Sequence, residues 1–177
     1  ELQLFGINHK TTKLSERELF IINDSNQEDF KNFFQSAFGE SIDSFFALST
    51  CNRTEVYIFR SSSSAMRIAQ KTLEFFGCSE SLNNDLYFFN GKDAIKHMCY
   101  VASGLDSQVL GEQEILGQFK KSIQTYIELG SLKGEFQRLT DDIISIAKAA
   151  RTETQIGFNP LSVSGLSLKI VQEIFED

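Results

Sequence analysis

The chain has 177 residues, which suits one domain or a domain with an appendage. Its 41% hydrophobic and 12% aromatic content is typical of a folded globular protein and excludes an intrinsically disordered one. Lys and Arg total 17 against 24 Asp and Glu, and the net charge of −7 gives no basic field to attract nucleic acid, so any RNA contact has to be local.

The three cysteines, Cys51, Cys78 and Cys99, are odd in number and lack C-x-x-C spacing. This pattern argues for a reducing compartment and against a disulfide framework or a zinc site. No apolar run approaches the ~20 residues that a membrane-spanning helix needs, and no signal peptide is recognisable at the N-terminus. We therefore expect a cytoplasmic protein that binds neither a membrane nor a metal.

Strand and helix signals alternate over residues 1–90. Two capping boxes, Ser15-x-x-Glu18 and Ser25-x-x-Glu28, predict the starts of helices, the second ending at Gly39. Hydrophobic periodicity predicts the rest: strands at 2–9, 42–49, 55–60 and 86–89, a helix at 66–76 and a loop at 78–84. The order βαββαβ predicts an α+β fold, a ferredoxin-like unit with an antiparallel sheet and helices on one face.

Strand signals are absent after Gly91, and residues 91–158 read as a helical subdomain. Asp93 is suited to cap a first helix, and further helical patterns run over 105–129 and 132–154. A last helix follows Pro160 and simply stops at the end of the chain. The sequence therefore looks cut from a longer protein.

A polar cluster with a cysteine at its centre occupies residues 48–55 (LSTCNRTE), between two apolar, strand-like stretches. A turn there would present Cys51, and a nearby guanidinium such as that of Arg53 would stabilise its thiolate. The alternative is a small buried hydrophobic side chain, the usual state of a free cysteine. Because Ser, Thr, Asn, Arg and Glu crowd around Cys51, we favour a functional site.

A second polar segment spans residues 103–118 (SGLDSQVLGEQEILGQ). If it is helical, Ser107, Glu114 and Gln118 share one face, and such a stripe suits a small polar ligand. A solvated helix face is the commoner alternative. Two glycines inside a helix cost about 1 kcal/mol each relative to alanine, which indicates close approach of a ligand or of a neighbouring backbone.

For two further polar residues, the sequence pattern by itself favours a structural role over a functional one. His97 lies off the apolar face of its helix, so we expect a half-buried or surface histidine. Arg151 ends a helix, where a cation complements the helix dipole.

Nucleotide-binding motifs are absent from the sequence. No three glycines have G-x-G-x-x-G spacing, and Gly91-Lys92 is followed by Asp93 rather than by Ser or Thr, so there is neither a dinucleotide fingerprint nor a P-loop. A redox cofactor, if one matters, is expected to bind elsewhere. With only His9 and His97 in the chain, a histidine-rich metal site is excluded.

Several specific segments occur along the chain: GINHKT (6–11), LSTCNRTEVY (48–57), HMCYVASGLDSQVLGEQEILGQFKK (97–121), ARTETQIG (150–157) and SVSG (162–165). Together they resemble the N-terminal catalytic region of the glutamyl-tRNA reductase family. The resemblance runs from end to end of the chain in the same order. None of these segments is a generic fingerprint.

The resemblance implies an enzyme of porphyrin and other tetrapyrrole biosynthesis by the five-carbon route. In this family the glutamyl ester on tRNA is reduced with NADPH to glutamate-1-semialdehyde. The motif STCNRTE implies that Cys51 is the nucleophile, which releases the tRNA and holds glutamate as a thioester for hydride transfer. His97 matches a histidine important for activity, in proton transfer to the leaving hydroxyl or the nascent aldehyde.

The resemblance also implies the residues that bind the glutamyl group. Arg53 is expected to contact the substrate carboxylate, and a glutamate of the second polar segment to neutralise the substrate ammonium. The implied substrate-binding residues are Thr50, Asn52, Arg53, Ser107, Glu112, Gln113, Glu114 and Gln118. Many family members have Pro-Gln where this chain has Gln113-Glu114, and Ala-Pro where it has Thr12-Lys13.

The family's NADPH-binding domain and C-terminal dimerisation helices are absent from this chain. No cofactor-binding residue is therefore expected here, and residues 159–177 are expected to begin the long connecting helix that leads to both parts. We expect the chain by itself to form the thioester and to hydrolyse it. The implied partners are glutamyl-tRNA, the aminomutase that receives the aldehyde, and a second subunit bound through the missing C-terminal part.

The sequence also leaves a different class of function open. A βαββαβ unit with an exposed sheet also serves as a non-catalytic RNA-binding module. The acidic composition and the lack of a basic, aromatic RNA-binding motif at residues 86–89 argue against it. An adaptor domain that uses the Cys51 turn only structurally is a further alternative.

Overall fold

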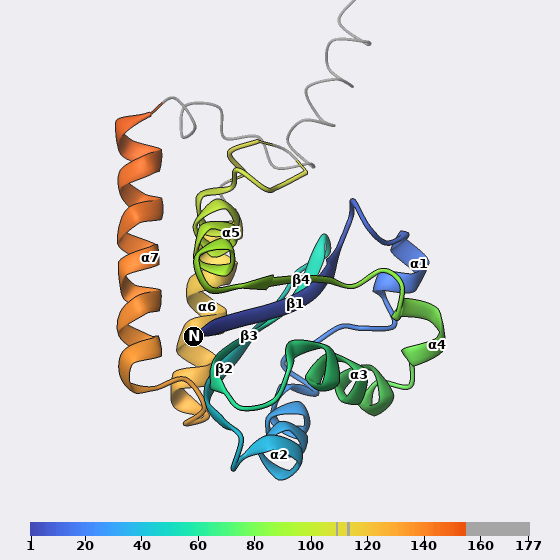
Figure 1. Cartoon of the computed structure of the whole chain (residues 1–177). Coiled ribbons are helices and arrows are strands. Elements are labelled where there is room, and N and C mark those ends of the chain that lie inside the picture. The colour runs from blue at the N-terminus through green and yellow to red at the C-terminus, as the bar shows by residue number, and fades with distance from the viewer. Residues whose placement is uncertain (109, 113, 155–177) are drawn as a thin grey trace, which may run out of the picture.

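The computed structural model describes residues 1–108, 110–112 and 114–154 (Figure 1). Within these ranges it contains a four-stranded sheet and seven helices. The elements are β1 (Leu2–Asn8), α1 (Leu14–Arg17), α2 (Gln27–Phe38), β2 (Ile42–Ser49), β3 (Arg53–Ser61), α3 (Ala65–Phe75), α4 (Ser79–Leu82), β4 (Tyr87–Asn90), α5 (Gly91–Ser103), α6 (Glu114–Glu128) and α7 (Gly134–Glu153).

The strands lie in the order β2-β3-β1-β4, and each neighbouring pair is antiparallel. The α+β class with an antiparallel sheet is therefore confirmed. Tyr57 of β3 pairs with Leu4 of β1 on one side and with Phe46 of β2 on the other. Because side chains alternate along a strand, this register places every second residue of β3, from Arg53 to Phe59, on one face of the sheet.

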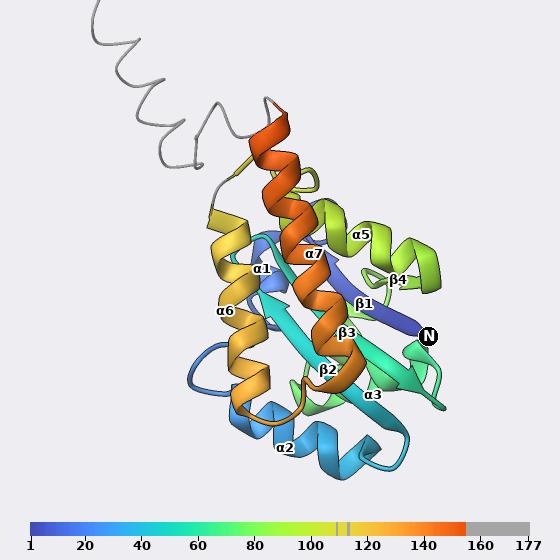
Figure 2. The same cartoon turned by 90° about the vertical axis from the view of Figure 1, so that its left-hand side faces the viewer.

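Helices cover both faces of the sheet. On one face α2 packs on β2, where the Phe34 and Phe45 rings lie 4.2 Å apart, and α3 lies on the same side (Figure 1). On the other face the ring of Phe46 lies 5.7 Å from Phe119 of α6 and 5.5 Å from Phe136 of α7. Figure 2 shows α5, α6 and α7 along this second face. The helices α5, α6 and α7 thus cover the second face of the sheet, and their buried residues belong to the same hydrophobic core as those of the strands.

Both predicted capping boxes are wrong. Helix α1 is a single turn after Lys13, and α2 begins after Asn26 rather than after Ser25. The hydroxyl of Ser25 donates instead to Oδ1 of Asn23 at 2.6 Å, and the Asn26 side chain accepts the backbone N–H of Asn23 at 2.8 Å. Local side-chain hydrogen bonds of this kind compete with capping, and the helix starts one residue later than predicted.

The helix predicted over 105–129 is shorter in the structure, where it is α6 over Glu114–Glu128. Helix α5 continues to Ser103 and ends at Gly104, whose φ of +79° is left-handed, and α6 begins only at Glu114. Gly111 also has φ +79° and lies outside any helix, whereas Gly117 lies within α6 with no neighbouring atom within 4 Å of a built Cβ. A close approach therefore occurs at Gly104 and not at Gly117.

The remaining elements agree with the prediction in part. The helix predicted over 132–154 is confirmed as α7, but the predicted loop at 78–84 contains the short helix α4. The helix predicted after Pro160, and with it the unit 159–177, lies outside the described residues. Within the part that is described, no helix has both the length and the apolarity to cross a membrane.

Candidate active site

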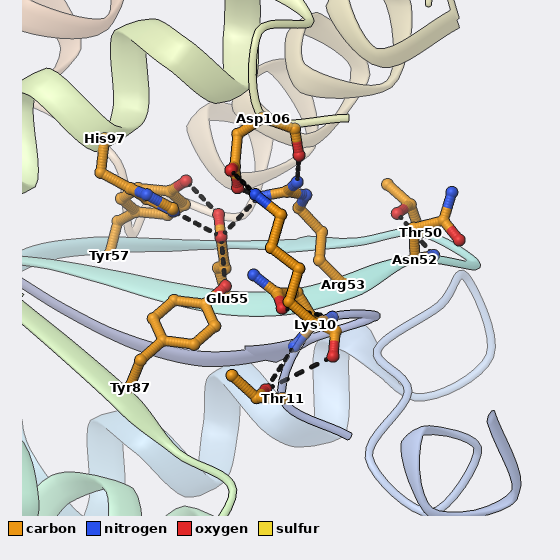
Figure 3. Close-up of polar contacts among 11 residues, drawn as sticks. Lys10, Thr11, Thr50, Asn52, Arg53, Glu55, Tyr57, Tyr87, His97 and Asp106 are labelled. Atoms are coloured by element: carbon orange, nitrogen blue, oxygen red, sulfur yellow. Dashed lines mark hydrogen bonds and ion pairs between the residues drawn. The ribbon is translucent and has the colours of Figure 1, made fainter. Parts of the chain in front are cut away.

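A buried carboxylate, that of Glu55, is the centre of a polar network on the face of the sheet covered by α5 (Figure 3). Arg53, Glu55 and Tyr57 alternate along β3 and so share this face. One oxygen of Glu55 accepts hydrogen bonds from Arg53 at 2.9 Å, from the Tyr87 hydroxyl at 2.5 Å and from Nε2 of His97 at 2.7 Å. The other oxygen accepts a hydrogen bond from the hydroxyl of Tyr57.

Gly6 makes room for this carboxylate. In the sheet Gly6 pairs with Glu55 on β3 and with Tyr87 on β4. A Cβ atom at Gly6 would lie 2.7 Å from Cγ of Glu55 and 2.7 Å from the carbonyl oxygen of Thr54. Real Cβ atoms do not approach other atoms so closely, so the sheet requires glycine at this position.

The charges of the network are fixed by their neighbours. Burial by itself raises the pKa of Glu55, but the Arg53 guanidinium and the hydrogen bond from His97 outweigh burial and hold this pKa well below its usual range. Burial lowers the pKa of Arg53, but the negative charge of Glu55 outweighs burial, so this pKa lies above its usual value. Burial and the Glu55 charge raise the pKa of both Tyr57 and Tyr87. At neutral pH both tyrosines are therefore hydrogen-bond donors to an ionised carboxylate.

Asp106 extends the network to two other segments of the chain. Its carboxylate accepts a hydrogen bond from Arg53 at 3.1 Å and another from Nζ of Lys10, and its backbone carbonyl accepts a second one from Arg53. Burial raises the pKa of Asp106, but Lys10 and Arg53 outweigh burial and lower it. The end of β1, the start of β3 and the connection between α5 and α6 are thus joined through one carboxylate.

Cys51 lies at the tip of the hairpin between β2 and β3. The N–H of Thr50 donates to the carbonyl of Arg53 at 2.8 Å, and the N–H of Asn52 donates to the Thr50 hydroxyl at 3.2 Å. The carbonyl of Asn52 accepts the N–H of His9 at 2.9 Å, which fixes the turn to the end of β1. Cys51 itself is exposed, so the alternative of a buried structural cysteine is wrong.

The other two cysteines have different surroundings. Cys78 is buried, and burial raises the pKa of its thiol to about 11. Cys99 is half-buried on α5, and burial raises its pKa as well. Cys51 is therefore the cysteine of this chain that is open to a substrate.

The comparisons with known proteins agree on one family. The family model described as "Glutamyl-tRNAGlu reductase, N-terminal domain" matches residues 5–154. The chain belongs to this family. The solved glutamyl-tRNA reductase from Methanopyrus kandleri superposes with a TM-score of 0.73 at 29% sequence identity, over 97% of this chain and 39% of that one.

Curated glutamyl-tRNA reductases are similar along nearly the whole chain. The proteins from Pseudoalteromonas atlantica and Saccharophagus degradans are each 38% identical over 173 residues, which is 97% of this chain. The same alignments cover 40% of each relative. The chain therefore spans about 40% of the length of the curated glutamyl-tRNA reductases that it matches.

The structure brings only some of the predicted site residues together. Arg53 and His97 meet at Glu55, whereas Thr50 and Asn52 lie on the other side of Arg53 from His97 (Figure 3). Ser107 and Glu112 are half-buried in the connection between α5 and α6, and Ser107 is not on a helix. The predicted helical stripe that includes Ser107 is therefore wrong.

Two other predicted residues of this glutamyl-tRNA reductase segment, Glu114 and Gln118, lie on α6. Glu114 is its exposed first residue, and Gln113 lies outside the described residues. Gln118 lines a cavity of about 510 Å³ beside the edge strand β2, together with Ser49 and Lys121. The structure therefore does not bring Gln118 into the network around Glu55.

Arg53 has a different environment from the one predicted. Its side chain is 1% exposed, and its guanidinium contacts Glu55 and Asp106. In this conformation a substrate carboxylate reaches Arg53 only by replacing Asp106. The role of Arg53 in binding the substrate carboxylate stays a prediction.

The sequence pattern did not single out the carboxylates of this network. Glu55 was read as part of the polar cluster and Asp106 as part of a helix. The signal for Glu55 was the alternation of Arg53 and Glu55 inside an apolar strand, because two charged residues on one buried face have to be paired. Within the described residues no three His, Cys, Asp or Glu side chains gather as a metal site would require.

Proposed function

We propose that this chain forms the glutamyl thioester of a glutamyl-tRNA reductase. The observation that carries the proposal is the exposed Cys51 at the tip of a hairpin, within the residues 5–154 that the family model matches. Arg53, two residues after Cys51, donates hydrogen bonds to Glu55 and Asp106. A rigid support of this kind holds a nucleophile in a defined direction, which is a general requirement of a catalytic group.

The proposed reaction has two steps. The Cys51 thiolate attacks the carbonyl carbon of the glutamyl ester, the new C–S bond forms, the C–O bond to the tRNA ribose breaks, and the ribose oxygen takes up a proton. Water then attacks the thioester, which releases glutamate and restores the thiol. For proton transfer to the leaving oxygen we propose His97, whose ring is held by Glu55 and by stacking on Phe89 at 4.7 Å.

Glu112 is the group that we propose for the substrate ammonium. Burial and the neighbouring Glu114 raise the pKa of Glu112, and Arg53 and Arg151 oppose them. Glu112 is thus half-buried close to the Arg53 network, where a carboxylate gains from pairing with an ammonium group. Thr50, Asn52 and Ser107 are proposed to contact the rest of the glutamyl group.

The ferredoxin-like arrangement is part of the proposal. It is supported by the strand order β2-β3-β1-β4, because β3 pairs between β1 and β2 while β1 pairs between β3 and β4. The helices α2 and α3 connect the strands as a split βαβ unit requires. The boundaries at residues 90 and 158 stay predictions.

The residues of this chain do not fit the dinucleotide NADPH. The sheet is antiparallel, and the chain has no glycine-rich turn between a parallel strand and a helix such as binds a pyrophosphate. The mechanism proposed for this chain therefore ends at the thioester and its hydrolysis. Hydride transfer from NADPH, the aminomutase partner and dimerisation belong to the proposed whole enzyme.

The RNA-binding or adaptor alternative is not favoured. An RNA-binding module of this topology uses one open face of its sheet, on which bases stack. Here α2 and α3 cover one face, and α5, α6 and α7 cover the other (Figures 1 and 2).

Release of glutamate from charged tRNA tests the proposal. The wild-type chain is expected to release glutamate faster than the uncatalysed rate, and Cys51→Ser is expected to lose this activity. Cys99→Ser is the matched control, because Cys99 is half-buried on α5 and should retain it. Equal rates for wild type and Cys51→Ser would contradict the proposal.

A further inference from the structure

Arg151, near the end of α7, contacts both ends of the connection between α5 and α6. Its Nη2 donates to the backbone carbonyl of Glu112 at 2.5 Å. A Cβ atom on Gly104 would lie 3.0 Å from the same Nη2 and 3.1 Å from the Glu112 carbonyl. Gly104, Glu112 and Arg151 are therefore packed together, and the absence of a side chain at Gly104 allows the contact.

The connection that Arg151 contacts is a closed loop, of which residues 104–108 and 110–112 are described. The N–H of Gly111 donates to the carbonyl of Gly104 at 3.0 Å, and the N–H of Leu105 donates to the carbonyl of Tyr100 at 2.9 Å. Between these contacts, Asp106 is bound by Arg53 and Lys10. The loop is thus attached to the sheet through Asp106 and to α7 through Arg151.

The burial and the contacts of Arg151 are not those expected of a residue that only complements the helix dipole. A cation that only complements the dipole lies in solvent near the last carbonyl groups. Arg151 is instead half-buried, and its Nε is buried without a hydrogen-bond partner among the described residues. Burying a guanidinium with an incomplete set of partners costs free energy, so the contact with the loop has to offset this cost.

We propose that Arg151 is a positioning residue for the substrate loop, acting through the Glu112 carbonyl and Gly104. It holds the backbone that carries Ser107 and Glu112, the residues proposed to contact the glutamyl group. Arg151 itself does not touch the substrate in this arrangement. This inference rests on the proposed function, since it assigns a purpose to a loop of the same site.

Amide hydrogen exchange tests the positioning without any substrate. Arg151→Gln keeps much of the side-chain volume but removes the guanidinium, and Arg151→Lys keeps a cation that can reach the carbonyl. Exchange at the Leu105 and Gly111 amides is expected to become about tenfold faster in the glutamine variant and to return toward the wild-type rate in the lysine variant. Arg138→Gln, on the exposed side of α7, is the matched control and should leave both amides unchanged.

Glutamate release from glutamyl-tRNA then tests the link to the substrate. Arg151→Gln is expected to raise the half-saturating concentration of glutamyl-tRNA about tenfold, with a smaller change in the maximal rate, because the loop binds the substrate and does not react. Alkylation of Cys51 by iodoacetamide should keep its wild-type rate. Faster amide exchange with an unchanged half-saturating concentration would overturn the inference and leave the proposed function intact.

A second variant covers the case in which Arg151→Gln unfolds the protein. Gly104→Ala places a methyl group against Arg151 at a φ of +79°, from the opposite side of the contact. It should raise the same exchange rates and the same half-saturating concentration. Unchanged exchange rates in Gly104→Ala would overturn the inference. Absence of glutamate release by the wild-type chain, in contrast, would count against the proposed function itself.

Discussion

His97 donates from Nε2 to Glu55, 42 residues earlier in the chain, at 2.7 Å. Because the Arg53 guanidinium and the surrounding hydrogen bonds keep Glu55 ionised, its oxygens only accept, and the hydrogen of a neutral His97 imidazole has to be on Nε2. Nδ1 is then the nitrogen that remains for proton exchange. The buried carboxylate thus selects one tautomer of the histidine that the family resemblance marks as important.

The first prediction concerns the charge of Glu55. Glu55→Gln removes a buried anion and leaves Arg53 with Asp106 alone, so we expect the free energy of unfolding to fall by about 3 kcal/mol. Glu74→Gln is the control, since Glu74 is exposed and pairs with the exposed Lys71. Its effect should stay within about 0.5 kcal/mol. Urea denaturation measures both changes, and equal losses would refute the role of Glu55.

A pH dependence follows from the same carboxylate. The folded-state pKa of Glu55 is depressed, so its contribution to stability is present above the unfolded pKa of about 4.5 and is lost as the pH falls. As the pH falls below about 5, the free energy of unfolding of the wild type should decrease by up to about 1.4 kcal/mol per pH unit through this group. Denaturation at several pH values should show a shallower slope for Glu55→Gln. A slope that the substitution leaves unchanged would argue that Glu55 is not ionised in the folded state.

Two glycines should respond to alanine in opposite directions. At Gly6 a methyl group meets Glu55 and the Thr54 carbonyl at 2.7 Å, so Gly6→Ala should destabilise the protein by about 2 kcal/mol. At Gly117, inside α6, nothing lies within 4 Å of a built Cβ, so Gly117→Ala should stabilise by about 0.5 to 1 kcal/mol. Thermal unfolding of the two variants measures both effects, and a stabilising Gly6→Ala would show that the sheet has space over Glu55.

The cysteines should differ in their reaction with iodoacetamide. The thiolate is the reactive form, and burial raises the pKa of Cys78 to about 11 and also raises that of Cys99, whereas Cys51 is exposed. We therefore expect the order Cys51, then Cys99, then Cys78. Peptide mass spectrometry at increasing times of reaction gives the order. Faster labelling of Cys99 than of Cys51 would remove the structural argument for a selective nucleophile.

Much of the fold was predictable from local pattern. Two apolar, strand-like stretches on either side of the polar cluster predicted the hairpin with Cys51 at its turn, and the helical pattern over 132–154 predicted α7. The long connection between α5 and α6 was missed because the helical pattern was extended back to Leu105, which placed Gly111 inside a helix. Gly104 and Gly111 both have left-handed backbones, and the packing of Arg151 against Gly104 is a tertiary contact that a local pattern does not contain.

The exposed position of Cys51 at a turn was predictable from the sequence, whereas the network that supports this turn was not. Cys51 was recognisable from the polar side chains around it, whereas the partners of Glu55 come from three different elements. His97 alone read as a half-buried or surface histidine, because its partner lies on a strand 42 residues away. The same separation hid Asp106, which meets Arg53 across 53 residues.

The intact mass of the chain after a brief incubation with glutamyl-tRNA and an acid quench shows whether Cys51 forms a thioester. We expect a glutamyl adduct on the wild-type chain and on Cys99→Ser, and no adduct on Cys51→Ser. An adduct that persists in Cys51→Ser, or a wild-type chain that binds the charged tRNA without forming any adduct, would contradict this expectation.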